Sequence, residues 1–478
     1  MDHQANMHRG FNWLGSATVV TKLLDFGTTL TVLWFLTKQE VGTAALILSI
    51  SVVIEAVSGL GVDAALVQAK WLSRRQLDST FWFALGVNGS AATLVALAAP
   101  LIERLYGIAG MAIYFVVVAA KLPLVGIALV PLALMTRELK YERIAIVNVA
   151  ATFAAAVTRL IVAMLGGGVW AFVAGYAADG LFILIGAQIA QPFLPRLCFQ
   201  ARAIRSLVRF GIRAAASTGL QQLYKNVDVL LVGWFYGPSP LAIYRVAITV
   251  AMGPAIAIGA VVSRAVFPVF SKIAAAGEHL APAFIWAIGR IAILIGPLMV
   301  ALVLAASPLT ALVHDARGSS YAAAALPLQL LAVAALLRSM FELLYPLTLA
   351  TGRPQITMRV AMATLALLTA GITTAGSVFG AQAGIVAVAG VWLILYPLLL
   401  AWGTRYVSRT LAIGLRELAR SLALPLLAGA GVVAVALSSR LFIYGAEPRL
   451  QVAGIVVALA LTYAGAFAYT RRRALASG

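Results

Sequence analysis

The stretch Lys22-Leu23-Leu24-Asp25 places two opposite charges three residues apart, near the middle of an apolar run over residues 11–36. Residues at this spacing share one face of a helix. The run is long enough to cross a bilayer, which takes about 20 apolar residues. A charge at membrane depth costs on the order of 3 kcal/mol, so such side chains usually face other helices or a water-filled cavity. The pattern returns at Lys225-Asn226-Val227-Asp228, which predicts the same arrangement twice in one helical bundle.

The composition of the whole chain agrees with this interpretation. Of 478 residues, 62% are hydrophobic and 11% are charged, and the mean hydropathy is +0.99. A soluble domain has about 25% charged residues. The first run is too long and too charged for a signal peptide, so we expect it to be retained. We predict an all-α polytopic membrane protein with about fourteen transmembrane helices, at roughly 11–36, 41–69, 79–102, 112–135, 144–166, 169–191, 214–236, 242–269, 282–306, 322–349, 358–378, 383–403, 421–441 and 450–470.

Lysine and arginine are unevenly distributed over the predicted loops. With the N-terminus inside, the inner loops and tails hold 22 of these residues and the outer segments hold six. Positive residues favour the cytoplasmic side, so we expect both termini in the cytoplasm and an even number of helices. This distribution also accounts for most of the net charge of +19 without a nucleic acid partner. The inner arginines are expected to favour anionic lipid headgroups of the bilayer.

Spacings in the two halves of the chain indicate an internal repeat. The Lys-x-x-Asp pairs lie 203 residues apart, Trp34-Phe35 and Trp234-Phe235 lie 200 apart, and Asp63 and Arg264 lie 201 apart. These matches predict two six-helix lobes related by a parallel pseudo-two-fold axis along the membrane normal. The predicted parts are an N-terminal lobe over residues 1–200, a C-terminal lobe over 201–410, and two extra helices with a basic tail over 411–478.

Ionisable residues at membrane depth concentrate on the first two helices of each predicted lobe, where we expect them to line a central cleft. Lys22–Asp25 and Lys225–Asp228 are interpreted either as cavity groups or as ion pairs within one helix. Asp63 and Arg264 lie near the cytoplasmic interface and are either a gate or a snorkelling pair. The full set at depth is Lys22, Asp25, Glu55, Asp63, Lys121, Arg159, Asp179, Lys225, Asp228, Arg264, Arg290, Arg338 and Glu342.

Three further groups have different expected roles. Arg338 and Glu342 are spaced i, i+4 and favour a structural pair. Arg159 and Asp179 are expected to lock the fifth predicted helix to the sixth. Lys121 stands alone on its helix beside Pro123, and an unpaired lysine at depth indicates a side chain that faces a ligand. Prolines within spans remove backbone hydrogen bonds and bend helices, which suits a transporter, but proline is also common in membrane helices.

Several kinds of site have no signature in the sequence. There is no G-x-x-x-x-G-K-[ST] motif for ATP, no nucleophile elbow, and no cluster of Cys and His for a metal. Cys198 is the single cysteine, so an intramolecular disulfide is excluded. We therefore expect no metal, no cofactor and no catalytic residue, and we predict that the protein is not an enzyme.

The run Trp34–Gln68, WFLTKQEVGTAALILSISVVIEAVSGLGVDAALVQ, resembles the polysaccharide transporter family of oligosaccharide flippases. That family belongs to the multidrug/oligosaccharidyl-lipid/polysaccharide superfamily. The similar features are the turn Glu40-Val41-Gly42, the helix end from Gly61 to Gln68, the Phe267-Pro268 pair and the turn from Ala350 to Pro354. The plan of six, six and two helices extends the resemblance over the whole chain. Within the family the sequence is similar to Wzx- and WzxC-like flippases of Gram-negative bacteria.

The resemblance implies a flippase of the bacterial inner membrane. Its substrate would be a polyprenyl-diphosphate-linked oligosaccharide for exopolysaccharide, O-antigen or capsule synthesis, moved to the periplasmic leaflet by alternating access through a cationic cavity. A polysaccharide polymerase or export machinery would be its protein partner. A diphosphate needs positive partners, and the candidates for binding it are Lys22, Lys121, Lys225, Arg264 and Arg338. The candidates for charge partners or coupling-ion groups are Asp25, Asp228, Glu55, Asp63 and Glu342.

Three other functions fit parts of the sequence. A cation-coupled multidrug exporter of the same superfamily would have twelve helices and favour an acidic cavity, whereas fourteen helices and more basic than acidic groups at depth are predicted here. A membrane polymerase or ligase would need a sizeable outer loop, and the longest predicted one runs only from Ser307 to Tyr321. A scaffold in an export complex remains an alternative only if the charges at depth are dispensable.

Overall fold

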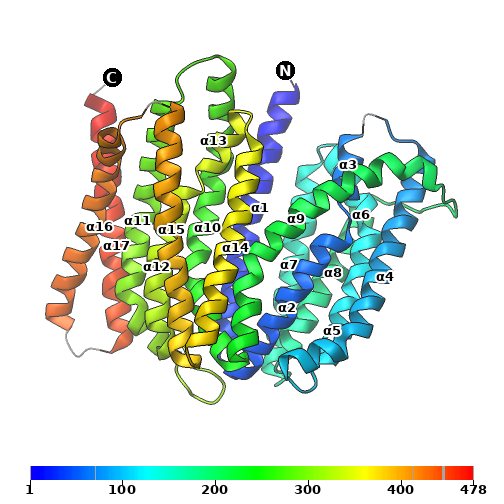
Figure 1. Ribbon diagram of the computed structural model, residues 1–478, viewed down its shortest axis with the longest axis horizontal. Coiled ribbons are helices and arrows are strands. Elements are labelled where there is room, and N and C mark those ends of the chain that lie inside the picture. Colours follow the sequence, from blue (N-terminus) through cyan, green and yellow to red (C-terminus); the bar gives the residue numbers. More distant parts are fainter. Residues whose placement is uncertain (1, 70, 412, 444–446, 477–478) are drawn as a thin grey trace. The chain divides into compact units, whose positions relative to one another are not determined.

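The computed structural model describes residues 2–69, 71–411, 413–443 and 447–476, and in these ranges the chain is almost wholly helical (Figure 1). The β-type pairing recorded there is one isolated bridge between His314 and Ser320. Eleven helical segments of the described chain are long and apolar enough to cross a membrane. The predicted all-α polytopic fold is therefore confirmed, whereas the number of fourteen crossings stays a prediction.

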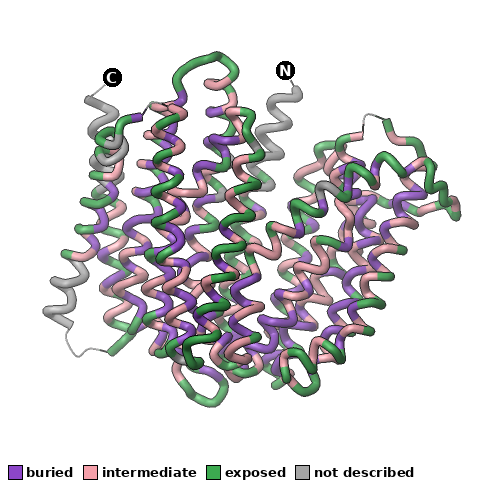
Figure 2. Tube along the Cα trace, in the orientation of Figure 1, coloured by how far each residue is buried: buried purple, intermediate pink, exposed green. Residues whose placement is uncertain are grey.

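By packing, the chain divides into two compact units, unit 1 over Met1–Ala242 and unit 2 over Ile243–Gly478. Figure 2 shows buried positions running along the helices and exposed positions gathering at the turns. The helices of unit 1 are α1 (Asp2–Val32), α2 (Lys38–Ser58), α3 (Val62–Gln68), α4 (Arg74–Tyr106), α5 (Met111–Ala119), α6 (Lys121–Arg137), α7 (Tyr141–Met164), α8 (Trp170–Ala190) and α9 (Ala201–Tyr236).

Unit 2 is built around α11, which packs against α12, α16 and α17. The indole of Trp392 donates a 2.9 Å hydrogen bond to the hydroxyl of the buried Tyr244, which ties α15 to α10. Its helices are α10 (Pro238–Ala275, beginning at the end of unit 1), α11 (Ala281–Leu312), the 3₁₀ turn η1 (Ala322–Ala324), α12 (Ala325–Phe341), α13 (Leu344–Ala350), α14 (Pro354–Val378), α15 (Ala381–Leu411), α16 (Leu415–Ile443) and α17 (Pro448–Ala476).

The compact units do not have the bounds of the predicted lobes. In the packing, α9 belongs to unit 1, where it contacts α2, α3 and α4. It begins at Ala201, thirteen residues before the predicted start, because its first turns bury Ile204 and Leu207. The lobe boundaries at residues 200 and 410 and the pseudo-two-fold axis stay predictions.

Each predicted span corresponds to one helix or to a pair of helices divided by a short break. The first break, between α2 and α3, is the stretch Gly59-Leu60-Gly61, where Leu60 and Gly61 have positive φ of 44° and 59°. Such values end a helix. Gly211 of α9 lies against this break, since a Cβ there would lie 2.4 Å from the carbonyl oxygen of Leu60. The break and α9 therefore pack backbone to backbone.

The other two breaks come just before prolines. Between α5 and α6, Ala120 interrupts the helix, and Pro123 is the third residue of α6. Between α12 and α13 the interruption is at Glu342 and Leu343, and Pro346 is the third residue of α13. Proline has no N–H and is tolerated in the first turn of a helix, where the N–H groups have no intrahelical partner. Each proline thus fits the first turn of the helix that restarts after the break.

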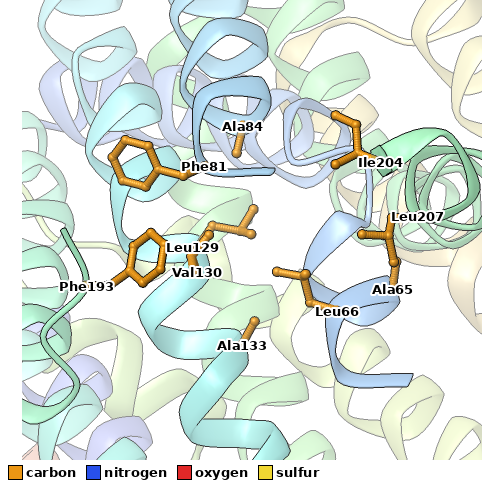
Figure 3. Close-up of a cluster of buried hydrophobic side chains, with 10 residues drawn as sticks. All are labelled: Ala65, Leu66, Phe81, Ala84, Leu129, Val130, Ala133, Phe193, Ile204 and Leu207. Atoms are coloured by element: carbon orange, nitrogen blue, oxygen red, sulfur yellow. The ribbon is translucent and has the colours of Figure 1, made fainter. Parts of the chain in front are cut away.

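An apolar core at one end of unit 1 joins four helices and one loop (Figure 3). It joins α3, α4, α6 and α9 with the loop after α8. Arg137 of α6 donates hydrogen bonds to the carbonyls of Leu66, at 3.2 Å, and Ala69, and so holds the C-terminal end of α3. The buried residues of this core are Ala65, Leu66, Phe81, Ala84, Leu129, Val130, Ala133, Phe193, Ile204 and Leu207.

Candidate functional site

Lys121 is the centre of a buried ionic network, here named the Lys121 cluster, with Glu55, Tyr176 and Asp179. Its Nζ lies 3.2 Å from Oε2 of Glu55 on α2 and 3.1 Å from Oδ2 of Asp179 on α8. The same ammonium lies 3.9 Å from the ring centroid of Tyr176, whose hydroxyl donates a hydrogen bond to Glu55. The cluster therefore links three helices that are distant in sequence.

The local sequence explains how Lys121 reaches this position. It is the first residue of α6, directly after the break at Ala120. Its stem lies against α8 at Gly180, where an added Cβ would come within 2.4 Å of the Cγ of Lys121. Glycine at position 180 therefore leaves room for the lysine stem to pass α8. The ammonium then contacts the carboxylate of the adjacent residue, Asp179.

The charge balance of the Lys121 cluster is one ammonium against two carboxylates. Lys121 is only 5% exposed, while the carboxylates of Glu55 and Asp179 are partly exposed. A hydrogen bond to Asp179, the ion pair with Glu55 and a cation–π contact with Tyr176 satisfy the buried ammonium. The sequence-based interpretation of Lys121 as an unpaired lysine is therefore wrong, because its partners come from helices far away in sequence. Its contact with a substrate stays a prediction.

A second ion pair joins α1 to α7. Nη1 of Arg159 lies 3.0 Å from Oδ1 of Asp25 and 3.1 Å from Oγ1 of Thr29. The guanidinium also lies 5.2 Å from the ring centroid of Phe172. The expected lock between Arg159 and Asp179 is wrong, because Arg159 bonds to Asp25 and Asp179 bonds to Lys121.

One face of α8 contacts both Arg159 and Lys121. Phe172 and Gly175 lie against Arg159, with a Cβ at Gly175 placed 3.2 Å from the arginine Cβ. Tyr176, Asp179 and Gly180 lie against Lys121 one turn later. These positions follow the i, i+3, i+4, i+7 and i+8 spacing of a single helix stripe. Phe172, Tyr176 and both glycines were not predicted as site residues, although they lie at this helical spacing around Asp179 in the sequence.

The lysines of the two Lys-x-x-Asp stretches are exposed on their helices. Lys22 lies on α1, and in the described part of the chain no carboxylate is recorded within 4 Å of its ammonium. The interpretation of Lys22–Asp25 as an intrahelical pair is therefore wrong, since Asp25 is engaged by Arg159. On α9, Lys225 is exposed and Asp228 is buried.

The remaining candidates have different surroundings. Arg338 and Glu342 form the expected pair at 2.7 Å, and Gly259 of α10 faces Glu342, since a Cβ there would lie 3.5 Å from Oε2. Asp63, in the first turn of α3, is exposed. The side chain of Arg264 lies outside the described residues. Among the residues that the structure describes, no group of three or more His, Cys, Asp or Glu is placed to hold a metal ion.

The sequence profile of a family described as polysaccharide biosynthesis protein matches residues 34–325. The lipopolysaccharide biosynthesis protein WzxC of Escherichia coli strain K12 is 23% identical over 78% of this chain and 75% of its own length. The teichuronic acid biosynthesis protein TuaB of Bacillus subtilis strain 168 is 24% identical over 84% of this chain and 83% of its own. The succinoglycan biosynthesis transport protein ExoT of Rhizobium meliloti strain 1021 is 23% identical over 80% and 76%.

Solved structures share the fold. The lipid II flippase MurJ in an inward closed conformation superimposes with a TM-score of 0.75, at 13% identity, over 97% of this chain and 99% of that one. An inward-facing multidrug resistance transporter of the MATE family and the MOP superfamily superimposes with a TM-score of 0.64, at 14% identity, over 81% and 95%. At these identities the likeness concerns the fold alone.

Proposed function

Because the chain belongs to the family of polysaccharide biosynthesis proteins, we propose that it is a flippase for a polyprenyl-diphosphate-linked oligosaccharide. The unit would pass from the cytoplasmic to the periplasmic leaflet for the synthesis of an exopolysaccharide, O-antigen or capsule. Its relatives are named for the synthesis of three polymers, lipopolysaccharide, teichuronic acid and succinoglycan. A transfer step that recognises the lipid diphosphate is compatible with all three polymers.

The observation that carries this proposal is the position of Lys22. Its carboxylate neighbour Asp25 is held by Arg159 at 3.0 Å, and the exposed ammonium of Lys22 has no recorded partner within the described part of the chain. A cation at membrane depth that lacks a counter-ion favours an anionic ligand, and a diphosphate supplies charge-assisted hydrogen bonds to it. We assign the diphosphate to Lys22 first. Lys225, Arg264 and Arg338 are the further cationic candidates of the proposed cavity.

In this proposal Lys121 binds the diphosphate only after one of its two carboxylate partners has been neutralised. Its ammonium is held by Glu55 and Asp179, so an anion would have to compete with two carboxylates. A proton or a metal cation bound by either carboxylate would weaken that hold and release Lys121 toward the diphosphate. Glu55 is therefore a coupling-ion candidate, as are Asp25, Asp63, Asp228 and Glu342 in the wider set. Alternating access would carry the substrate between the leaflets.

The proposal is tested by deleting the gene in its own host. We expect loss of surface polysaccharide and accumulation of the polyprenyl-diphosphate-linked sugar inside spheroplasts, protected from an added glycosidase. The wild-type gene should restore export. Lys22→Ala and Lys225→Ala, at matched membrane expression, should reduce export at least tenfold. The matched control is Lys272→Ala, because Lys272 is an exposed lysine near the end of α10.

Two results would overturn parts of this proposal. Normal polysaccharide in the deletion strain, together with raised sensitivity to cationic drugs, would favour the multidrug exporter. Restored export by Lys22→Ala and Lys225→Ala would keep the flippase function but remove these lysines from the transport path. Labelled lipid-linked sugar in proteoliposomes separates transport from a scaffold role, since a scaffold would leave the sugar in its original leaflet.

A further inference from the structure

Four large apolar side chains lie exposed past the helix ends at the end of unit 1 that holds the core of Figure 3. Here they are named the Leu197 patch: Trp71, Leu194, Leu197 and Phe199. Leu197 is 92% exposed and Trp71 is 88% exposed. Three of them belong to the loop between α8 and α9, and Trp71 precedes α4 by three residues. They are therefore not the lipid-facing side of a membrane span.

The loop that carries the patch is held against α4 by hydrogen bonds. The indole of Trp82 donates a 2.8 Å hydrogen bond to the carbonyl of Arg196, and Arg74 donates to the carbonyl of Leu194. The backbone N–H of Arg196 donates to Oδ1 of the buried Asp78, at 3.2 Å. The neighbouring Phe193 is buried, with its ring 6.0 Å from that of Phe81. The loop thus turns polar backbone groups inward, onto α4, and apolar side chains outward.

This arrangement suits the edge of an apolar environment. In the acyl region of a bilayer a backbone polar group without a partner costs several kcal/mol, so loops there need internal hydrogen bonds. In water the same exposed leucines, phenylalanine and tryptophan would be unfavourable as a group. The hydrogen bonds to α4 satisfy part of the loop backbone and so lower the cost of placing the loop at the edge of the leaflet.

The first turns of α9 add a basic stripe beside the patch. Arg202, Arg205 and Arg209 are exposed and are spaced by three and four residues, whereas Ile204 and Leu207 on the opposite side are buried in the core. Within the described ranges no carboxylate is recorded within 4 Å of these three guanidinium groups. Figure 1 shows this part of α9 passing beside α3 and α4. The stripe therefore offers three uncompensated charges at one end of unit 1.

We propose that this end of unit 1 is a binding surface for anionic phospholipid, with the Leu197 patch inserted at the boundary of headgroups and acyl chains. Arg202, Arg205 and Arg209 bind the lipid phosphates. Apolar side chains that enter this boundary, combined with basic residues, are the physical basis of interfacial anchoring. Each arginine near an anionic leaflet contributes a factor of about five in binding, so three give a preference on the order of a hundredfold over zwitterionic lipid.

Cys198 allows a direct test, because it is the single cysteine and lies half-buried within the loop. A nitroxide on Cys198 of the full chain is measured in nanodiscs of phosphatidylcholine alone and of phosphatidylcholine with 30% phosphatidylglycerol. We expect collisions with oxygen, relative to a nickel chelate, to be at least twofold more frequent in the anionic nanodisc. Arg202→Gln/Arg205→Gln/Arg209→Gln should abolish this difference, and Leu197→Asn should reduce it.

The matched control removes three exposed arginines from unit 2, as Arg353→Gln/Arg359→Gln/Arg416→Gln, and should leave the Cys198 signal unchanged. A label equally open to the nickel chelate in both nanodiscs would overturn the proposal. So would an oxygen preference that persists in the triple variant of α9, since that would leave no role for the arginines. Shielding that appears only on addition of an acidic soluble protein fraction would assign the surface to a protein partner instead.

Discussion

At the residue scale, the Lys121 cluster explains how a lysine is held inside an apolar bundle. A single charge at membrane depth costs on the order of 3 kcal/mol. Two carboxylates and an aromatic ring surround this ammonium, and Tyr176 also donates to Glu55. Breaking such a buried network by removing one partner is strongly destabilising, because the remaining charges lose their counter-ion. The cluster therefore adds charged contacts between α2, α6 and α8 to the apolar packing of α6 against α8.

We predict that Lys121→Met destabilises unit 1 by about 3 kcal/mol, because it leaves Glu55 and Asp179 facing each other without a cation. The measurement is the apparent Tm of the purified protein in detergent, followed by fluorescence-detected size exclusion. Lys121→Met combined with Glu55→Gln and Asp179→Asn should regain most of this loss. If the combined variant is as unstable as the single one, the packing of the lysine stem rather than its charge holds the helices.

Residue identities at depth were predictable, but their partners were not. The sequence places Arg159 and Asp179 on consecutive helices, α7 and α8, which suggested a pair. Pairing depends on how each helix is rotated about its axis and on which face it packs. Asp179 and Gly180 lie on the face of α8 that meets Lys121, whereas Phe172 and Gly175 meet Arg159 a turn or more earlier. By contrast, the Arg338–Glu342 pair lies within four residues and was predicted correctly.

At the element scale, the helix breaks determine where charged side chains are presented. Lys121 opens α6 and Glu342 lies in the break before α13. The apolar runs predicted continuous spans there, because hydropathy does not register a single interrupted turn. The sequence does contain signals for these breaks, namely Pro123, Pro346 and the Gly59-Leu60-Gly61 stretch. The prolines were interpreted only as helix bends, and the glycine stretch was not interpreted as a break.

We predict that Gly180→Ala separates α8 from α6. The new Cβ would lie 2.4 Å from the Cγ of Lys121, and overpacking of this kind costs about 1–3 kcal/mol. Thermal unfolding and polysaccharide export should both decline. Gly89→Ala on α4 is the matched control, since a Cβ there meets nothing within 4 Å and alanine is favoured over glycine in a helix by about 0.5–1 kcal/mol. Equal stability of the two variants would contradict the close approach at Gly180.

At the scale of the whole molecule, composition and hydropathy were sufficient for the fold class. The likeness to MurJ covers 97% of the chain, and the family match over residues 34–325 confirms the resemblance found in the Trp34–Gln68 run. The orientation, the lobe boundaries and the number of crossings depend on loops and on packing between distant segments, which periodicity does not contain. They remain predictions that labelling from either side of the membrane is able to test.

We predict that the two ends of α11 lie on opposite sides of the membrane, with the turn before it inside. In a Cys198→Ser background, Ala316→Cys marks the exposed loop after α11 and Glu278→Cys marks the exposed turn before it. A membrane-impermeant maleimide should label Ala316→Cys in intact spheroplasts and Glu278→Cys only after permeabilisation. The reverse pattern would place the arginine-rich side of the protein outside.

The Lys121 cluster has a consequence for how the protein is made. Its members are encoded 66 and 58 residues apart, at Glu55, Lys121 and then Asp179. A ribosome delivers α6 to the membrane while α8 is still unsynthesised, so Lys121 enters with one of its two carboxylates missing. Unit 1 therefore completes its ionic contacts only after the translocon has received α8. Until then, the insertion machinery has to keep the Lys121 ammonium, which is only partly neutralised, away from lipid.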